Sequence, residues 1–358
     1  MSEIFDSASY PFNDLTAQQL HLNLVQLFPT VKSAITVAER ADIDTTTIFI
    51  EQAVYYVWRE ILVQAATAGL VRDVVVEADK LTNEKSPLKS FLEKLLSDIT
   101  PPIEAQPSGS NGSPDFINSD DEITEREALL YYDDLTIQTG RLNGFIKTLQ
   151  ILSTLVPSVC KLNIDVNGIT QYGTAFRIDT NLLLTNWHVL HDKAGNRATN
   201  VTAEFGYEDD GAGGIITPTL ISCDINNINS NRSDDWGIIQ VAQPLDESIP
   251  IVKLSDAVDP VVSSPAYIIQ HPGGARKRIG FIRNQVSYFD ERVVHYLTDT
   301  QAGSSGSPVF NADGKLIALH HAGGQPQEIL GKTPTKKNEG IRISRIIEGL
   351  SGNKVEVN

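Results

Sequence analysis

The chain has 358 residues, 41% of them hydrophobic, and a formal net charge of −16. This length predicts two domains, and the hydrophobic content is sufficient for packed cores, which excludes a largely disordered chain. Nucleic acids and anionic membranes attract clustered Lys and Arg, whereas the only dense basic run here is Arg276–Arg278. We therefore expect neither as a partner.

The first residues, MSEIFDSASYPFN, have neither a basic start nor a long apolar stretch, so we expect no secretory signal peptide. No apolar run approaches the length of a membrane span. Cys160 and Cys223 are the only cysteines. Two reduced thiols in a cytoplasmic protein is the simplest interpretation.

Residues 1–96 show the apolar spacing of helices and predict an all-α bundle. Thr16 followed by Gln19 indicates a capping box at one helix start, and Gly69 indicates a helix end. The longest apolar stripe between these points comprises Val54, Val57, Trp58, Ile61, Leu62 and Ala65.

Residues 97–123 are rich in Pro, Ser, Gly, Asn and acidic side chains, which predicts a flexible acidic linker. A helical leader is expected over 124–155. From 156 to 358 short β-type runs alternate with Gly, Asp, Asn and Pro clusters, which is typical of an all-β barrel or sandwich. The sequence thus predicts an α + β multidomain protein, with an N-terminal all-α bundle and a C-terminal all-β domain.

Three segments of the all-β region carry candidate catalytic residues. His188 follows a strand in LLLTNWHVL, Asp235 precedes the strand WGIIQV, and Ser305 lies in the turn GSSGSPVF. A histidine can accept the serine proton, and a carboxylate can orient the imidazole. The order His, Asp, Ser along the chain is that of the chymotrypsin group of triads.

With these motifs, residues 156–348 resemble the trypsin-like serine peptidases of the chymotrypsin (S1) clan, especially the bacterial branch with glutamyl endopeptidases and HtrA-like proteins. The resemblance implies a double β-barrel and an endopeptidase acting through His188, Asp235 and Ser305. It also implies that the backbone N–H groups of Gly303 and Ser305 form the oxyanion hole. A relative that has lost activity would share the same fold.

Two neighbouring positions qualify this resemblance. We choose Asp235 over Asp234 because it directly precedes the Trp-Gly-Ile-Ile strand, and we expect Asp234 to be solvated. Secreted trypsins carry an aspartate before the nucleophile that pairs with a newly cut N-terminus, whereas this chain has Ser304 there. Activation by N-terminal insertion therefore has no partner.

The candidate substrate-binding residues are Asp299, His320 and His321. Asp299 lies where trypsins bind Arg or Lys, but similar glutamyl endopeptidases also carry Asp-Thr there. A histidine near His320 binds the substrate carboxylate in those enzymes, and strand alternation places His320 towards the pocket and His321 on the other face. A preference for an acidic or for a basic substrate residue at the cleaved bond remains open, and the acidic one is favoured. Either histidine could instead be an ordinary buried side chain. No motif indicates a metal or another cofactor.

The bundle resembles the effector-associated, death-like helical domains of bacterial conflict systems, through the stretch from Ile43 to Leu92. That resemblance implies a cytoplasmic role in defence and a partner that bears a matching domain, alongside a protein or peptide substrate. The alternatives are an unrelated bundle, an inactive adaptor with a protease fold, and an HtrA-like periplasmic protease.

Overall fold

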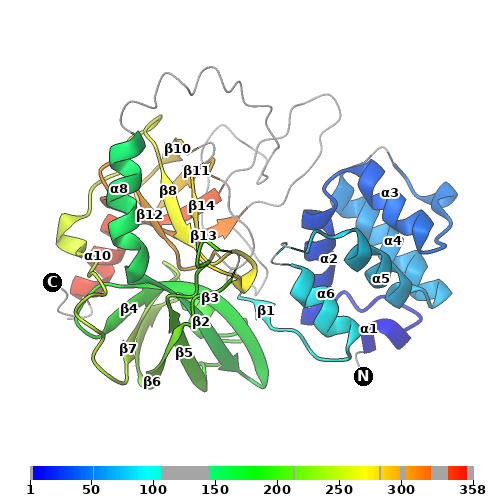
Figure 1. Ribbon diagram of the computed structural model, residues 1–358, viewed down its shortest axis with the longest axis horizontal. Helices are drawn as coiled ribbons and strands as arrows, with labels where there is room; N and C mark the ends of the chain where they lie inside the picture. The colour runs from blue at the N-terminus through cyan, green and yellow to red at the C-terminus, as the bar shows by residue number, and fades with distance from the viewer. Residues whose placement is uncertain are drawn as a thin grey trace. The chain divides into compact units, whose positions relative to one another are not determined.

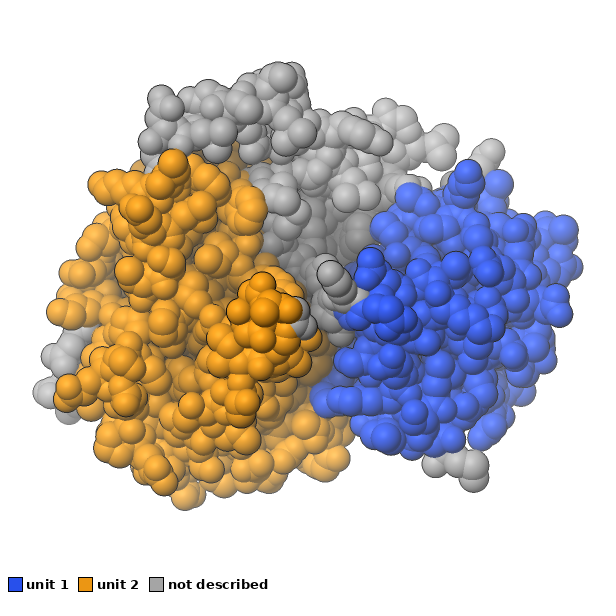
Figure 2. Space-filling view, in the orientation of Figure 1, with its two compact units in different colours: residues 1–103, 127–131, 325–335 blue, residues 104–126, 132–324, 336–358 orange. Residues whose placement is uncertain are grey.

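The computed structural model describes most of the chain outside the predicted linker, namely residues 3–50, 52–84, 86, 88–105, 145–212, 214–281, 284–298, 304–323 and 338–352. The chain divides into two compact units (Figures 1 and 2). The described residues of unit 1 all lie within 3–103, and those of unit 2 are 104–105 and the ranges from 145 onward. Most of the predicted linker and the first part of the predicted leader, residues 106–144, lie outside the described residues.

Unit 1 is a helical bundle. Its helices are α1 (Glu3–Asp6), α2 (Leu15–Leu27), α3 (Val31–Arg40), η1 (Thr45–Thr47), α4 (Val54–Ala68), α5 (Val71–Leu81) and α6 (Lys89–Leu96). The apolar stripe of α4 is fully buried and belongs to one core cluster, to which the other α-helices of the bundle also contribute apolar side chains. Trp58 is the largest of these side chains, and its indole N–H donates to Phe28 O at 3.2 Å.

The ends of two bundle helices differ in how well the sequence predicted them. Asp14, and not Thr16, caps α2, because the Asp14 carboxylate accepts from Ala17 N at 2.8 Å. The predicted capping box is therefore misplaced. Gly69 ends α4 with a φ of 71°, a left-handed conformation that glycine adopts without the clash a Cβ brings.

The first sheet of unit 2 closes into a six-stranded barrel. Its strands are β2 (Val159–Val166), β3 (Ile169–Arg177), β4 (Leu182–Thr185), β5 (Asn200–Phe205), β6 (Thr219–Asn231) and β7 (Trp236–Val241). They pair in the order β3-β2-β5-β6-β7-β4, and β4 pairs again with β3. The short β1 (Ile103–Glu104) borders β3, and Ala105 is buried in the barrel core. The chain is therefore ordered where its composition predicts the start of the linker.

The second sheet pairs in the order β10-β11-β14-β13-β12-β8-β9. A bridge between Pro265 and Gln285 joins the segment before β8 to the segment before β10 and so brings the sheet round towards a second barrel. Its strands are β8 (Tyr267–Gln270), β9 (Arg278–Gly280), β10 (Val286–Phe289), β11 (Val293–Tyr296), β12 (Pro308–Phe310), β13 (Leu316–Gly323) and β14 (Asn338–Arg342). The predicted fold class, a helical bundle followed by a double β-barrel, is confirmed.

Helices cover parts of unit 2. These are α8 (Phe145–Leu155), η3 (Val156–Ser158), α9 (Trp187–Leu190), η4 (Leu254–Asp256), η5 (Pro272–Gly274) and α10 (Ile343–Gly352). Helix α8 runs beside the second sheet (Figure 1), and Thr148 in it donates to Ala312 O at 2.9 Å. Among the described helices, none is both long and apolar enough to cross a membrane.

Both cysteines lie in the first barrel as buried free thiols. Burial raises the pKa of each, that of Cys223 to about 12. Neither thiol is therefore a ready nucleophile near neutral pH, since thiolates are the reactive form.

Candidate active site

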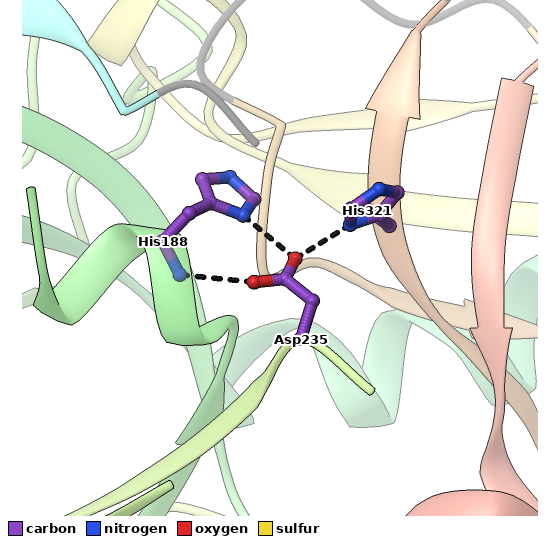
Figure 3. A group of neighbouring side chains, drawn as sticks. All are labelled: His188, Asp235 and His321. Atoms are coloured by element: carbon purple, nitrogen blue, oxygen red, sulfur yellow. Dashed lines mark hydrogen bonds and ion pairs between the residues drawn. The ribbon is translucent and has the colours of Figure 1, made fainter. Parts of the chain in front are cut away.

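His188 lies on α9, the single turn of helix that follows β4. Its Nδ1 donates to Asp235 Oδ2 at 2.7 Å, and its backbone N–H donates to Asp235 Oδ1 at 3.0 Å (Figure 3). One carboxylate therefore holds both the backbone and the ring of His188. The Nε2 atom on the other side of the ring is buried and has no hydrogen-bond partner among the described residues.

Asp235 directly precedes β7 and has a φ of 41°, an uncommon left-handed conformation for a residue with a side chain. Its backbone oxygen accepts from Asn186 Nδ2 at 2.8 Å, which links it to the residue before α9. Such strain persists where surrounding contacts over-determine it, and it often marks functional positions. Here it accompanies a carboxylate aimed at the His188 ring.

Ser305 enters the site from the second sheet, in the turn before β12. Its backbone oxygen accepts from Thr174 N of the first barrel at 2.8 Å, so the turn is anchored to both sheets. Gly306 follows with a φ of 87°, and a Cβ there would collide with Thr174 O and Thr185 Oγ1. The glycine after Ser305 is thus required by a close approach of backbone. The Ser305 hydroxyl donates to His321 O at 3.4 Å.

The two histidines of β13 point to different partners. His321 Nδ1 donates to Asp235 Oδ2 at 2.5 Å, on the side opposite His188 (Figure 3). His320 Nδ1 is hydrogen-bonded to the hydroxyl of Tyr296 at 2.5 Å. Both histidines are buried. The structure thus joins His188, Asp235 and His321 in one hydrogen-bonded group, with the Ser305 hydroxyl on the His321 backbone.

Asp299 and Gly303 lie outside the described residues, so their predicted roles in substrate binding and the oxyanion hole remain predictions. Ser304 is buried, and its hydroxyl donates to Gln270 Oε1. A neutral pair thus occupies the position where secreted trypsins hold an aspartate.

The expectation that Asp234 is solvated is wrong. Asp234 is only 5% exposed, and its carboxylate pairs with Arg345 at 3.2 Å and Arg292 at 3.4 Å. These two arginines come from α10 and from the segment before β11, both far along the chain, so local sequence could not reveal them. Two adjacent aspartates therefore serve different partners, one arginines and the other histidines.

The electrostatics of the group follow from burial and a shared carboxylate. Burial lowers the pKa of His188, although Asp235 partly opposes this effect. Burial would also lower the pKa of His321, but Asp235 and then Glu339 outweigh it and raise that pKa. The pKa of Asp235 is lowered, because the two imidazoles outweigh the effect of its burial. The carboxylate therefore stays ionised, His188 favours its neutral form and His321 its charged form.

His188, Asp235 and His321 also have the residue types and spacing of a metal centre, and among the described residues they form the one such group. Both Nδ1 atoms, however, lie at hydrogen-bond distance from the same Oδ2 atom. A cation bound to all three would need bonds of about 2.0–2.2 Å and the loss of both hydrogen bonds. In this structure the three side chains are joined to one another by hydrogen bonds, which a bound cation would replace.

A comparison with protein families supports the chemistry of this site. Residues 173–319 match the trypsin-like peptidase domain, a range that contains His188, Asp235 and Ser305. A protein of uncharacterised function from Sinorhizobium fredii, y4fB, is 32% identical over 233 residues, which cover 53% of this chain and 35% of that protein. The match thus spans about a third of the length of that relative.

Two solved proteases align with part of the chain at low sequence identity. A serine endoprotease from Yersinia pestis aligns with a TM-score of 0.43 at 14% identity, covering 58% of this chain and 66% of that one. A Glu endopeptidase aligns with a TM-score of 0.43 at 17% identity, covering 56% and 92%. The family match within unit 2 and the double-barrel topology support a serine peptidase with a trypsin-like domain.

Proposed function

We propose that the chain is a serine endopeptidase in which Ser305 is the nucleophile, His188 the general base and Asp235 the residue that orients the base. The observation that carries the proposal is the His188 ring itself. One ring nitrogen donates to a buried carboxylate, while the other is buried without a described partner, in the region that matches the peptidase domain. An imidazole held in this way is ready to accept a proton.

The proposed reaction begins when the Ser305 hydroxyl turns from His321 O to His188 Nε2. Nε2 takes the hydroxyl proton as Oγ bonds to the substrate carbonyl carbon, and then delivers it to the leaving amine as the C–N bond breaks. Water attacks the resulting ester by the same route in reverse and releases the acid. Asp235 stabilises the imidazolium at both steps, and we assign the oxyanion contacts to the N–H groups of Gly303 and Ser305.

A fluorophosphonate probe tests the proposal, because it reacts with an activated serine and needs no known substrate. Wild-type protein should be labelled at Ser305, and Ser305→Ala should not. Ser307→Ala is the matched control, since this buried neighbouring hydroxyl lies outside the proposed triad. Absence of wild-type labelling, or equal labelling of Ser305→Ala, contradicts the proposal.

One observation favours a second candidate, a signalling adaptor that keeps the protease fold only as a scaffold. The Ser305 hydroxyl bonds to a backbone oxygen in place of His188 Nε2. An adaptor would leave the probe unreacted at every pH while retaining partner binding. The labelling experiment therefore separates the two candidates.

We further propose a preference for acidic residues on the acyl side of the cleaved bond. Burial raises the pKa of Tyr296 well above its usual value, so its hydroxyl keeps its proton and can donate to His320 Nδ1. The His320 Nε2 atom then carries a proton that could be donated to a substrate carboxylate. Cleavage of a peptide library should enrich Glu or Asp at that position, and enrichment of Arg or Lys would instead support Asp299.

For the bundle we propose a recruiting role, in which a partner bearing a matching effector-associated domain brings the peptidase to its target in the bacterial cytoplasm. Tethering of this kind raises the local concentration of enzyme at a substrate without any new catalytic contact. The full-length chain should co-purify with such a partner, and the variant Trp58→Ala, which disrupts the bundle core, should not. Equal recovery of the partner with both proteins would contradict this role.

A further inference from the structure

His321 contacts both ends of the proposed triad. Its side chain donates to the Asp235 carboxylate at 2.5 Å, and its backbone oxygen accepts from the Ser305 hydroxyl at 3.4 Å. It approaches Asp235 from the second sheet, whereas His188 approaches from the first, and the two rings are 5.8 Å apart in an edge-to-face arrangement. Asp235 Oδ2 is therefore shared between two imidazoles (Figure 3).

A second carboxyl group lies behind His321. Glu339 on β14 is buried, and its Oε1 is 3.9 Å from His321 Nε2. His295 on β11 donates to the other oxygen, Oε2, at 2.9 Å. His321 thus stands between the carboxyl groups of Asp235 and Glu339.

This arrangement favours a proton on His321. Buried carboxylates are costly unless an opposite charge or several hydrogen bonds compensate them. A cation on His321 would face Asp235 directly and Glu339 at a longer distance, whereas one on His188 would face Asp235 alone. His295 donates to the Glu339 oxygen that lies away from His321, and the hydroxyl of Tyr296 on the same strand is hydrogen-bonded to His320.

We propose that His321 is a positioning residue of this peptidase: as an imidazolium it holds the far side of the Asp235 carboxylate and keeps His188 in the neutral form that can accept a proton. The proposal rests on the proposed function, because it assigns His188 as the base. The pKa shifts of the two histidines agree with the proposal. Asp235 and Glu339 together outweigh burial and raise the pKa of His321, whereas burial and the charge on His321 lower the pKa of His188. A base with a lowered pKa stays active to more acidic pH.

The variant His321→Asn separates charge from hydrogen bonding. The asparagine amide can replace Nδ1 as the donor to Asp235 but carries no charge. Without that charge, the pKa of His188 should rise by about one unit. As the pH is lowered, the rate of probe labelling at Ser305 should then begin to fall at a correspondingly higher pH than in wild type. The maximal rate at alkaline pH should change by less than about tenfold. His321→Ala also removes the donor and should lower the plateau by about 10–100-fold.

Histidine NMR of the full-length chain tests the charge without requiring activity. In wild type, the His321 ring should keep imidazolium shifts above pH 7, and His188 should titrate at lower pH than in His321→Asn. Should His321→Asn not fold, Glu339→Gln offers a second test, in which His321 should lose its proton at lower pH than in wild type. A neutral His321 ring in wild type at pH 6–7 overturns the proposal, as does an unmoved His188 titration in His321→Asn.

The two kinds of failure are distinguishable. Lack of Ser305 labelling in wild type would refute the proposed peptidase function, whatever the NMR result. If Ser305 is labelled but the pH at which labelling falls off is the same in His321→Asn as in wild type, the peptidase function stands and the role of His321 is refuted.

Discussion

The bundle and the barrel unit each bury a histidine, but the pKa of one is lowered and that of the other is raised. His21 of α2 is 3% exposed and bonds to Tyr55 O, and burial lowers its pKa to about 4. His321 of β13 is 2% exposed, yet its pKa is raised, because two carboxyl groups face it. Burial alone favours a neutral imidazole, whereas burial beside carboxylates can favour a charged one. The contrast indicates that burial determines the pKa of His21, whereas nearby charges determine the pKa of His321 in the candidate site.

The largest expected effect separates the two adjacent aspartates of the barrel unit. Asp235→Asn should slow probe labelling of Ser305 by about 10⁴-fold, since the imidazole loses the partner that sets its tautomer. Asp234→Asn is the matched control. It breaks contacts to Arg292 and Arg345 and should lower the melting temperature while changing labelling by less than about tenfold. Equal rate losses in the two variants would show that the distinction between them is wrong.

The next effect tests whether the bundle is held by packing. Trp58→Ala removes a fully buried side chain and should lower the free energy of unfolding of the bundle by about 3–5 kcal/mol. Denaturant titration measures this loss. Tyr56→Ala on the same helix is the control, because Tyr56 is 46% exposed and should change stability by less than about 0.5 kcal/mol. A fall in Ser305 labelling by Trp58→Ala under folding conditions would show that the units are coupled.

Acid should weaken the bundle through His21. The pKa of this ring is about 4 in the folded state and 6.5 ordinarily, so the unfolded chain takes up the proton first as pH falls. The stability that comes from neutral His21 is complete above pH 6.5 and decreases by about 3 kcal/mol as the pH falls to about 4. His21→Gln should lose this part of the pH dependence in thermal melts. An identical pH dependence in the variant would assign the acid sensitivity to other groups.

The smallest effect concerns the end of α4. Gly69→Ala places a Cβ at a φ of 71° but in open space, so only the backbone preference opposes it. The free energy of unfolding should fall by about 1 kcal/mol. Gly352→Ala is a control at a described position where a Cβ also meets open space and no positive φ is recorded. A loss well above 2 kcal/mol at Gly69 would indicate a hidden contact.

The strands of the first barrel differ in how clearly their side chains indicate them. The run Val159–Val166 has an alternating pattern of burial and forms β2. In contrast, β6 (Thr219–Asn231) is rich in Asn, Asp and Ser, and most of its side chains are at least partly exposed. Backbone pairing with β5 and β7 makes it a strand, with an irregularity between Asp224 and Ile228. Backbone pairing of this kind leaves no mark in the pattern of side chains.

The sequence by itself determined the two-part architecture and the residue types of the candidate triad. Local periodicity predicts helices and strands, and the His, Asp, Ser order is read directly along the chain. Only the tertiary structure decided which groups share Asp235, because His188 and His321 reach it from different sheets. The same long-range folding buried Asp234 against two arginines. Electrostatic partners depend on distances in space, and a change of a few ångströms decides whether a buried histidine is neutral or charged.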